Sequence, residues 1–383
     1  MMANRGSEIA RANQLLLTAL RAPMELPALG NADWELLLRV ARRSRLLGRL
    51  ESDLSRAGLL ESIPPRAAAH LRAARNVIEH RKTLTTWEVN RILWALEGMN
   101  VPLILLKGIA YVMADLPPAR GRIFADVDVL VPEELIGRVE ERLVARGWFK
   151  LPIDPYDDQY YRVWTHEIPP LRHRERGTEI DIHHRLLART SRLSSDPGPL
   201  FAAARPLAAN PRLHTLAPAD MVLHALLHLF LEGDPVEGLR FRDLVDVHDL
   251  LCHYGSEPGF WKRLVQRAAE LGFGRPLFYG LQHAQRLLST PVPEDVMEDI
   301  QDHAPLWPIR KIMDDLVRLS LLPGHADYPS LRSASARWLM YIRSHWLRMP
   351  PLLLAKHVLY KAWLRSRGIR KQVELTQLDL RQQ

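Results

Sequence analysis

The feature that most constrains this chain is a short apolar segment with two acidic residues at alternate positions. Residues 124–131 read Phe-Ala-Asp-Val-Asp-Val-Leu-Val, and Pro132 follows. This pattern predicts a β-strand that ends at the proline. Because side chains alternate along a strand, Asp126 and Asp128 share one face, about 7 Å apart, and the valines take the other.

Two neighbouring carboxylates on an apolar strand are costly, because they repel each other and lose hydration. A divalent cation between Asp126 and Asp128 would remove that cost. Mg²⁺ takes oxygen ligands and is typically held by one or two carboxylates together with substrate phosphates. The strand therefore predicts a site for Mg²⁺, or for Mn²⁺, that works on a phosphate-bearing ligand.

The residues before this strand are suited to hold phosphate. Residues 101–106 form a short apolar run that predicts a buried strand, and residues 109–116 predict one or two turns of helix. Lys107 and Gly108 lie between them. A glycine at a helix start lets phosphate oxygens approach free backbone N–H groups. Lys107 and Arg122 can add positive charge to this cradle.

A third carboxylate follows on a later segment. Residues 178–183 alternate apolar and polar side chains, which predicts a half-buried strand with Asp181 and His183 on its polar face. His183 could bind metal or phosphate, or orient Asp181. It could equally be a partly buried histidine with a structural role, as we expect for His184.

Taken together, these motifs resemble the bacterial nucleotidyltransferase family proteins of the DNA polymerase β-type nucleotidyltransferase superfamily. The family pattern is a Lys-Gly pair, a helix, an arginine, an Asp-x-Asp-x-Leu-Val strand and a later strand that ends in Asp-x-His. About 80 of the 383 residues carry the resemblance. The matching positions are Lys107, Gly108, Arg122, Asp126, Asp128, Asp181 and His183.

The resemblance implies a role for each matching residue. Asp126, Asp128 and Asp181 would bind two metal ions, and Asp181 would also help to deprotonate an acceptor hydroxyl. The implied reaction moves a nucleoside monophosphate from an NTP, for which ATP is the expected choice, to a hydroxyl of a small molecule, peptide, protein or RNA. The wider superfamily usually has Gly-Ser where this chain has Lys-Gly, so one phosphate contact is lost. The implied nucleotide-binding residues are Lys107, Gly108, Arg122 and His183.

Two other classes of function stay open at this point. The chain could be a non-catalytic adaptor that keeps the fold and binds an anionic partner or membrane surface through basic helices near its end. It could also transfer the γ-phosphate as a kinase, although the sequence contains neither a Walker A pattern nor a protein-kinase catalytic loop. The absence of Gly-x-Ser-x-Gly disfavours a serine hydrolase.

The predicted fold class is α+β, with a small mixed β-sheet nucleotidyltransferase core flanked by helical N- and C-terminal regions. Further strands are expected at residues 148–151 and 160–168, and a helix over 132–146. Proline, glycine and serine make residues 191–215 linker-like. The expected organisation is a helical region at 1–95, the core at 96–190, a helical domain at 191–329 and a basic helical tail at 330–383.

The predicted helical domain contains two polar patterns with alternative explanations. His224 and His228 are spaced to share a helix face and could ligate zinc, but two packed imidazoles explain the same letters. Arg242 and Asp243 could touch the nucleotide, or could form ion pairs within their own helix.

Charge is concentrated near the end of the chain. The net charge is +8, yet residues 330–371 contain ten Lys or Arg and no Asp or Glu, so the remainder is near −2 (8 − 10). Aromatic residues are interleaved with these cations, which suits an anionic membrane surface or a polyanion. A packed helical end with a basic outer face is the alternative. A single cysteine, no signal-like apolar run at the N-terminus and no apolar stretch of 18 residues favour a cytoplasmic protein.

Overall fold

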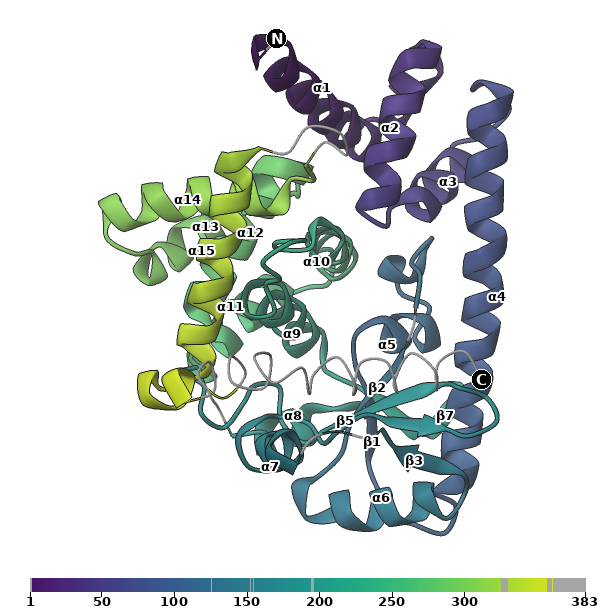
Figure 1. Cartoon of the computed structure of the whole chain (residues 1–383), viewed down its shortest axis with the longest axis vertical. Helices are drawn as coiled ribbons and strands as arrows, with labels where there is room; N and C mark the ends of the chain where they lie inside the picture. The colour runs from purple at the N-terminus through teal and green to yellow at the C-terminus, as the bar shows by residue number, and fades with distance from the viewer. Residues whose placement is uncertain are drawn as a thin grey trace. The chain divides into compact units, whose positions relative to one another are not determined.

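The computed structural model describes residues 2–124, 126–151, 153, 155–193, 196–324, 330–356 and 360. Its internal contacts divide the chain into two compact units (Figure 1). Each unit is assembled from segments that are distant in sequence. Unit 1 comprises 1–84, 111–124 and 218–342, and unit 2 comprises 85–110, 125–217 and 343–383. The four consecutive regions expected from the sequence stay a prediction.

Unit 1 is helical in its described residues. Its helix α9 is mostly apolar and almost entirely buried, as expected for a helix at the centre of a bundle. The helices of this unit are α1 (Met2–Arg21), η1 (Pro23–Ala28), α2 (Asn31–Arg43), α3 (Leu47–Arg56), the first part of α4 (Pro65–Ala95), η2 (Pro117–Ala119), α9 (Pro218–Leu231), α10 (Phe241–Tyr254), α11 (Phe260–Glu270), α12 (Gly274–Leu288), α13 (Glu294–Asp299), η4 (Ile300–His303), α14 (Trp307–Leu321) and most of α15 (Leu331–Arg348).

Unit 2 is built on a seven-stranded mixed sheet with the strand order β3-β4-β5-β2-β1-β7-β6. β2 pairs antiparallel with β1 and parallel with β5, and β1 pairs parallel with β7. The strands are β1 (Leu103–Leu105), β2 (Asp126–Leu130), β3 (Trp148–Lys150), β4 (Leu171–His173), β5 (Glu179–His183), β6 (Arg205–Leu207) and β7 (Asn210–Thr215). The helices are α6 (Ile136–Val144), preceded by η3 (Glu133–Leu135), α7 (Pro155–Trp164), α8 (Gly198–Ala203) and the first part of α5 (Lys107–Met113).

The second part of α4, residues 85–95, is fastened to the sheet by a buried ion pair. Arg176 follows β4 and donates hydrogen bonds of 2.9 Å from both Nε and Nη2 to Glu88, which is 1% exposed. The guanidinium of Arg176 also lies 5.4 Å from the ring centre of Trp87 and 4.7 Å from that of Trp148. A planar cation satisfies the buried carboxylate and stacks on aromatic faces at the same time.

The predicted strands at 101–106, 124–131, 148–151 and 178–183 are confirmed as β1, β2, β3 and β5. The strand expected at 160–168 is wrong, because α7 extends to Trp164. Arg162 pairs at 3.2 Å with Asp158, four residues earlier, and at 2.9 Å with Glu140. A pair at that spacing forms on a helix and not along a strand.

The linker-like interpretation of residues 191–215 is also wrong. This segment contains α8 and the hairpin of β6 and β7, and β7 extends the sheet beside β1. Pro206 is tolerated because β6 is an edge strand, where one backbone N–H group needs no partner. Leu213 in β7 is fully buried. Composition therefore masked two short strands that tertiary pairing stabilises.

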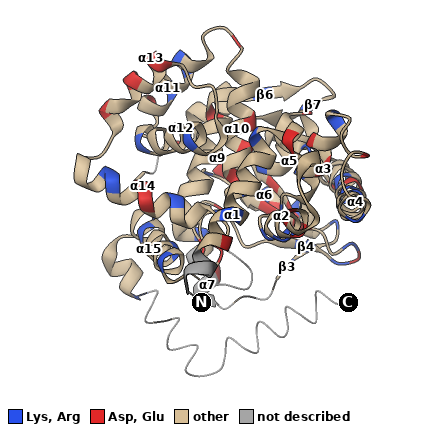
Figure 2. Ribbon diagram, turned by 90° about the horizontal axis from the view of Figure 1, so that it is seen from above, with Lys and Arg blue, Asp and Glu red and all other residues tan. Residues whose placement is uncertain are grey.

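The α+β class with a mixed sheet and helical flanks is confirmed. The first helix expected in the basic tail is α15, which carries four arginines and no acidic residue (Figure 2). The second, expected at 352–367, lies mostly outside the described residues. Among the described helices, none combines the length and the apolarity needed to cross a bilayer.

Candidate active site

The pairing of β2 with β5 brings the predicted carboxylates together. The two strands are parallel, and the register places Asp128 beside Asp181 and Asp126 beside Glu179. Neighbouring strands lie about 4.8 Å apart, so Asp128 and Asp181 are adjacent on one face of the sheet. Asp126 is exposed, Asp181 is half-buried and Asp128 is only 4% exposed. The exposure of these acidic side chains thus decreases from Asp126 through Asp181 to Asp128.

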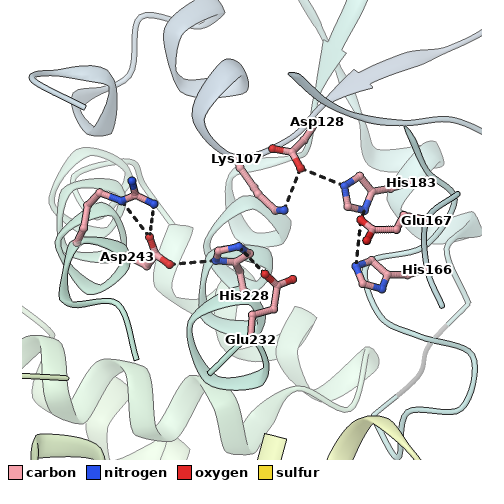
Figure 3. Close-up of polar contacts among 9 residues, drawn as sticks. Lys107, Asp128, His166, Glu167, His183, His228, Glu232 and Asp243 are labelled. Atoms are coloured by element: carbon pink, nitrogen blue, oxygen red, sulfur yellow. Dashed lines mark hydrogen bonds and ion pairs between the residues drawn. The ribbon is translucent and has the colours of Figure 1, made fainter. Parts of the chain in front are cut away.

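Asp128 is held by two cationic or polar side chains (Figure 3). Lys107 Nζ lies 2.9 Å and His183 Nε2 lies 3.1 Å from the same oxygen, Oδ1. Burial alone would raise the pKa of Asp128, but the Lys107 charge and the His183 contact outweigh it and hold the pKa well below its usual range. Asp128 is therefore ionised at neutral pH.

Lys107 reaches Asp128 from a strained backbone. Its φ of 49° lies in the left-handed region, which is uncommon for a residue with a Cβ. The strain occurs where β1 gives way to α5, directly after Leu106, whose N–H donates to the backbone carbonyl of Asp128 at 3.0 Å. Such outliers cost on the order of 1–3 kcal/mol and cluster at functional sites. Gly108 is the next residue, in the first turn of α5.

Asp181 lies in surplus negative charge. Burial raises its pKa first, and the charges of Asp128, Glu167 and Asp126 raise it further, with only partial relief from Lys107. A proton or a bound cation would remove this repulsion. The arrangement matches the chemistry of a group that takes up a proton, or that ligates a divalent ion.

His183 links this acidic cluster to a residue that the sequence analysis missed. Its Nδ1 lies 3.5 Å from Glu167 Oε2, while Nε2 faces Asp128, and the ring is 1% exposed (Figure 3). Glu167 pairs with His183 through an isolated β-bridge, and His166 Nε2 lies 3.9 Å from the Glu167 carboxylate. The signal was a His-Glu pair just before Pro169, which the wrong strand at 160–168 obscured.

The side chains of His166, Glu167 and His183 are also close enough to hold a metal ion. One ligand atom from each lies within 4.8 Å of the others. Two imidazoles and one carboxylate suit Mn²⁺ or Zn²⁺, whereas the aspartates alone suit Mg²⁺. His183 contacts both groups of possible ligands, because Nε2 lies near Asp128 and Nδ1 lies near Glu167.

Arg122 has its described contacts in unit 1. Its guanidinium lies 2.7 Å from Asp246 Oδ2 on α10 and 5.3 Å from the ring centre of Tyr111. The side chain is 9% exposed. The prediction that it binds nucleotide stays a prediction, and these contacts give it a structural role in its own unit.

The polar residues of α9 and α10 interact with one another. His228 Nε2 lies 2.8 Å from Glu232, and Nδ1 lies 3.1 Å from Asp243 (Figure 3). Burial would raise the pKa of Asp243, but His228 and Arg242 lower it below its usual range. Among the described residues, the metal-competent group does not include His224 or His228. The contacts therefore match a packed imidazole with local ion pairs better than a zinc pair.

A comparison with known families shows which family the chain belongs to. A family model described as uncharacterised nucleotidyltransferase matches residues 30–289. The chain belongs to this nucleotidyltransferase family. The match contains β2, β5 and their carboxylates, so the site that the sequence predicted lies within the family's own domain.

No curated protein and no solved structure matches the chain. The general function, nucleotidyl transfer, therefore rests on the family match. The individual roles of its residues have to be argued from its own geometry.

Proposed function

We propose that the chain is a metal-dependent nucleotidyltransferase that moves a nucleoside monophosphate from an NTP, with ATP the expected donor, to an acceptor hydroxyl. The observation that carries the proposal is the β2–β5 register, which sets Asp128 beside Asp181 and keeps Asp126 on the same face. Its resemblance to the DNA polymerase β-type superfamily supports the same assignment.

Asp126, Asp128 and Asp181 would hold the divalent cation, Mg²⁺ or Mn²⁺. The fit rests on the donor set, since the charges of Asp128 and Asp126 raise the pKa of Asp181 and a divalent cation would offset this repulsion. When bound, the cation would supply positive charge to the phosphates and the reacting oxygens. The His166, Glu167 and His183 group would extend this set of ligands.

Lys107 and Gly108 would receive the triphosphate. Lys107 Nζ lies 2.9 Å from Asp128, and its side chain is partly exposed, so the ammonium could pair with a phosphate oxygen. Gly108 presents a backbone without a Cβ in the first turn of α5. His183 would keep Asp128 oriented through its 3.1 Å contact.

The reaction is a single displacement at the α-phosphorus. The acceptor oxygen forms a bond to that phosphorus, and the bond from phosphorus to the oxygen that bridges to the β-phosphate breaks. Pyrophosphate leaves with the electron pair of the broken bond, and the hydroxyl proton passes to Asp181. The raised pKa of Asp181 would make this carboxylate a stronger proton acceptor than an ordinary aspartate.

The test uses NTPs labelled at either the α- or the γ-phosphate, with Mg²⁺ or Mn²⁺ and candidate acceptors of each class. Transfer of the α label, its loss with EDTA and its loss in Asp126→Asn support the proposal. Glu141→Gln, an exposed change on α6 of the same unit, is the matched control. Transfer of the γ label would indicate a kinase, and NTP binding without any transfer would indicate the adaptor.

A further inference from the structure

Unit 1 contains a cavity of about 230 Å³ that the proposed function does not use. It lies where the end of α2 meets the loop before α10, the end of α14 and one face of α15. Arginine is the most frequent residue of its wall. The polar and charged wall residues are Arg43, Ser44, Arg45, Glu237, Arg240, Arg242 and Arg337.

The wall carries a large excess of positive charge. Five arginines face one carboxylate, that of Glu237, which leaves a formal charge of +4 (5 − 1). Glu237 lies 3.5 Å from Arg45, and Arg242 pairs with Asp243 at 3.2 Å. Within the described residues, no ion pair involves Arg43, Arg240 or Arg337. Because like charges repel at close range, such a wall is costly without an anion.

Arg337 is built into the cavity rather than placed on its rim. A Cβ at position 238 would lie 2.6 Å from Arg337 Cγ, so Gly238 is what lets the arginine stem pass the loop. Burial lowers the pKa of Arg337, and the nearby charge of Arg43 lowers it further. Among the described residues, no hydrogen-bond partner is found for the buried Nε of Arg337 or of Arg240.

The loop that carries Arg240 is fixed in place. Asp234 and Gly238 exchange backbone hydrogen bonds of 3.1 and 2.8 Å, and Asp234 Oδ1 accepts two further N–H groups at 2.7 Å. Leu239 N–H donates to Ser320 Oγ, which is buried, at 3.1 Å. The backbone that carries Arg240 is therefore ordered without a ligand, which lowers the entropy lost on binding.

Helix α10 adds to the positive potential. Arg240 occupies its N-cap, so no side-chain acceptor caps the first N–H groups. The N-terminus of a helix carries partial positive charge and disfavours cations. Asp243 supplies a carboxylate in the first turn and pairs with Arg242. An arginine at the N-cap is the opposite of the usual choice, and an anion at this end would satisfy both Arg240 and the helix.

We propose that this cavity binds a compact, multiply charged phosphate-type anion, such as pyrophosphate or a terminal phosphate group. Guanidinium groups match phosphate oxygens in paired hydrogen bonds, and several of them converge here. The volume is below the roughly 300–1,000 Å³ typical of pockets for drug-sized ligands, which favours a small anion or a terminal phosphate group. The site belongs to unit 1 and is separate from the carboxylate cluster of unit 2.

The test measures binding of inorganic pyrophosphate and of inorganic phosphate to the full chain by calorimetry, with EDTA present so that no divalent cation recruits either anion to the carboxylates. We expect pyrophosphate to bind more tightly than phosphate, and both affinities to fall with added salt. Arg337→Gln and Arg240→Gln should each raise the dissociation constant about tenfold or more, the effect of losing a charge-assisted hydrogen bond.

Arg332→Gln is the matched control, because Arg332 is an exposed arginine of the same helix outside the cavity wall. Arg43→Gln removes an exposed wall arginine at a helix end and keeps the test valid if Arg337→Gln fails to fold. Equal weakening by Arg332→Gln, or unchanged affinity in all the wall variants, overturns the proposal. So does the absence of any pyrophosphate binding by the folded wild-type protein. None of these outcomes depends on nucleotidyl transfer.

Discussion

Two groups of carboxylates in this protein differ in the charged residues that surround them. In unit 1, buried acidic side chains pair with arginines: Asp220 pairs with Arg267 at 2.6 Å, and Asp249 pairs with Arg49. In unit 2, the described contacts of the cluster formed by Asp126, Asp128, Asp181 and Glu167 include Lys107, His183 and His166. Nearly equal numbers of opposite charges hold the helices together. The sheet concentrates one sign of charge.

The difference teaches how to separate structural from functional carboxylates in this fold. A buried carboxylate that is matched one-to-one stabilises packing, and its removal leaves an unpaired cation behind. Several carboxylates close together destabilise the folded protein through repulsion unless a cation or a proton is bound. Such clusters are typical of functional sites. The predictions below test this contrast, beginning with the largest effect.

Asp128→Asn should lower nucleotidyl transfer by at least about a hundredfold, because the change removes a charged ligand and the partner of both Lys107 and His183. Steady-state transfer of the α label measures it. Asp220→Ala, its counterpart in unit 1, should instead cost roughly 3 kcal/mol in the free energy of unfolding, because Arg267 loses its buried partner and keeps the exposed Glu270 at 3.2 Å. Per folded molecule, transfer by Asp220→Ala should stay at the wild-type rate. The reverse pattern would refute the contrast.

Lys107→Met should reduce kcat/KM by about 10- to 100-fold, since the change keeps the length of the side chain but removes the only lysine that contacts the cluster in the described contacts. We expect most of the loss to appear in KM for the NTP. Lys150→Met, an exposed lysine of unit 2 that pairs with Glu140 at 2.9 Å, is the control. An unchanged KM for the NTP would contradict the proposal that Lys107 binds the triphosphate.

Glu167→Gln should lower the pKa of Asp181 in the metal-free protein, because one of the like charges that raise it is removed. Carbon-13 NMR of aspartate carboxyls, with Asp181→Asn for assignment, measures the midpoint. In the wild type this carboxyl should titrate well above the usual range for Asp. Glu134→Gln, an exposed change in η3, should leave the midpoint in place. An Asp181 midpoint at its ordinary value would contradict the surplus of charge.

Asp246 in unit 1 gives the smallest effect. Burial and the charge of Asp243 raise its pKa to about 7 despite the pairing with Arg122. A carboxyl with a raised folded-state pKa binds its proton more tightly when folded, so it makes stability fall as pH rises from about 4 to 7. Asp246→Asn should remove that slope. Urea unfolding across this range, with exposed Asp315→Asn as the control, measures it, and parallel curves for wild type and Asp246→Asn would contradict the assignment.

Local sequence patterns were enough for part of the fold and for the acidic residues of the site. The alternation in residues 124–131 and 178–183 predicted β2, β5 and the shared face of Asp126 and Asp128. The same approach failed at 160–168 and at 191–215. The ion pair of Arg162 with the distant Glu140 favours a helix in the first segment, and pairing with β1 decides the second. Both depend on residues outside the local window.

The sequence by itself determined that three aspartates lie on polar strand faces, because a strand's side chains alternate with a fixed period. Only the tertiary structure decided that Asp128 and Asp181 are neighbours, that Glu167 joins them and that Arg122 pairs with Asp246. Register, loop path and the convergence of arginines on a cavity are set by contacts between distant segments. No local periodicity encodes these contacts, because they form only when segments that are distant in the sequence pack together.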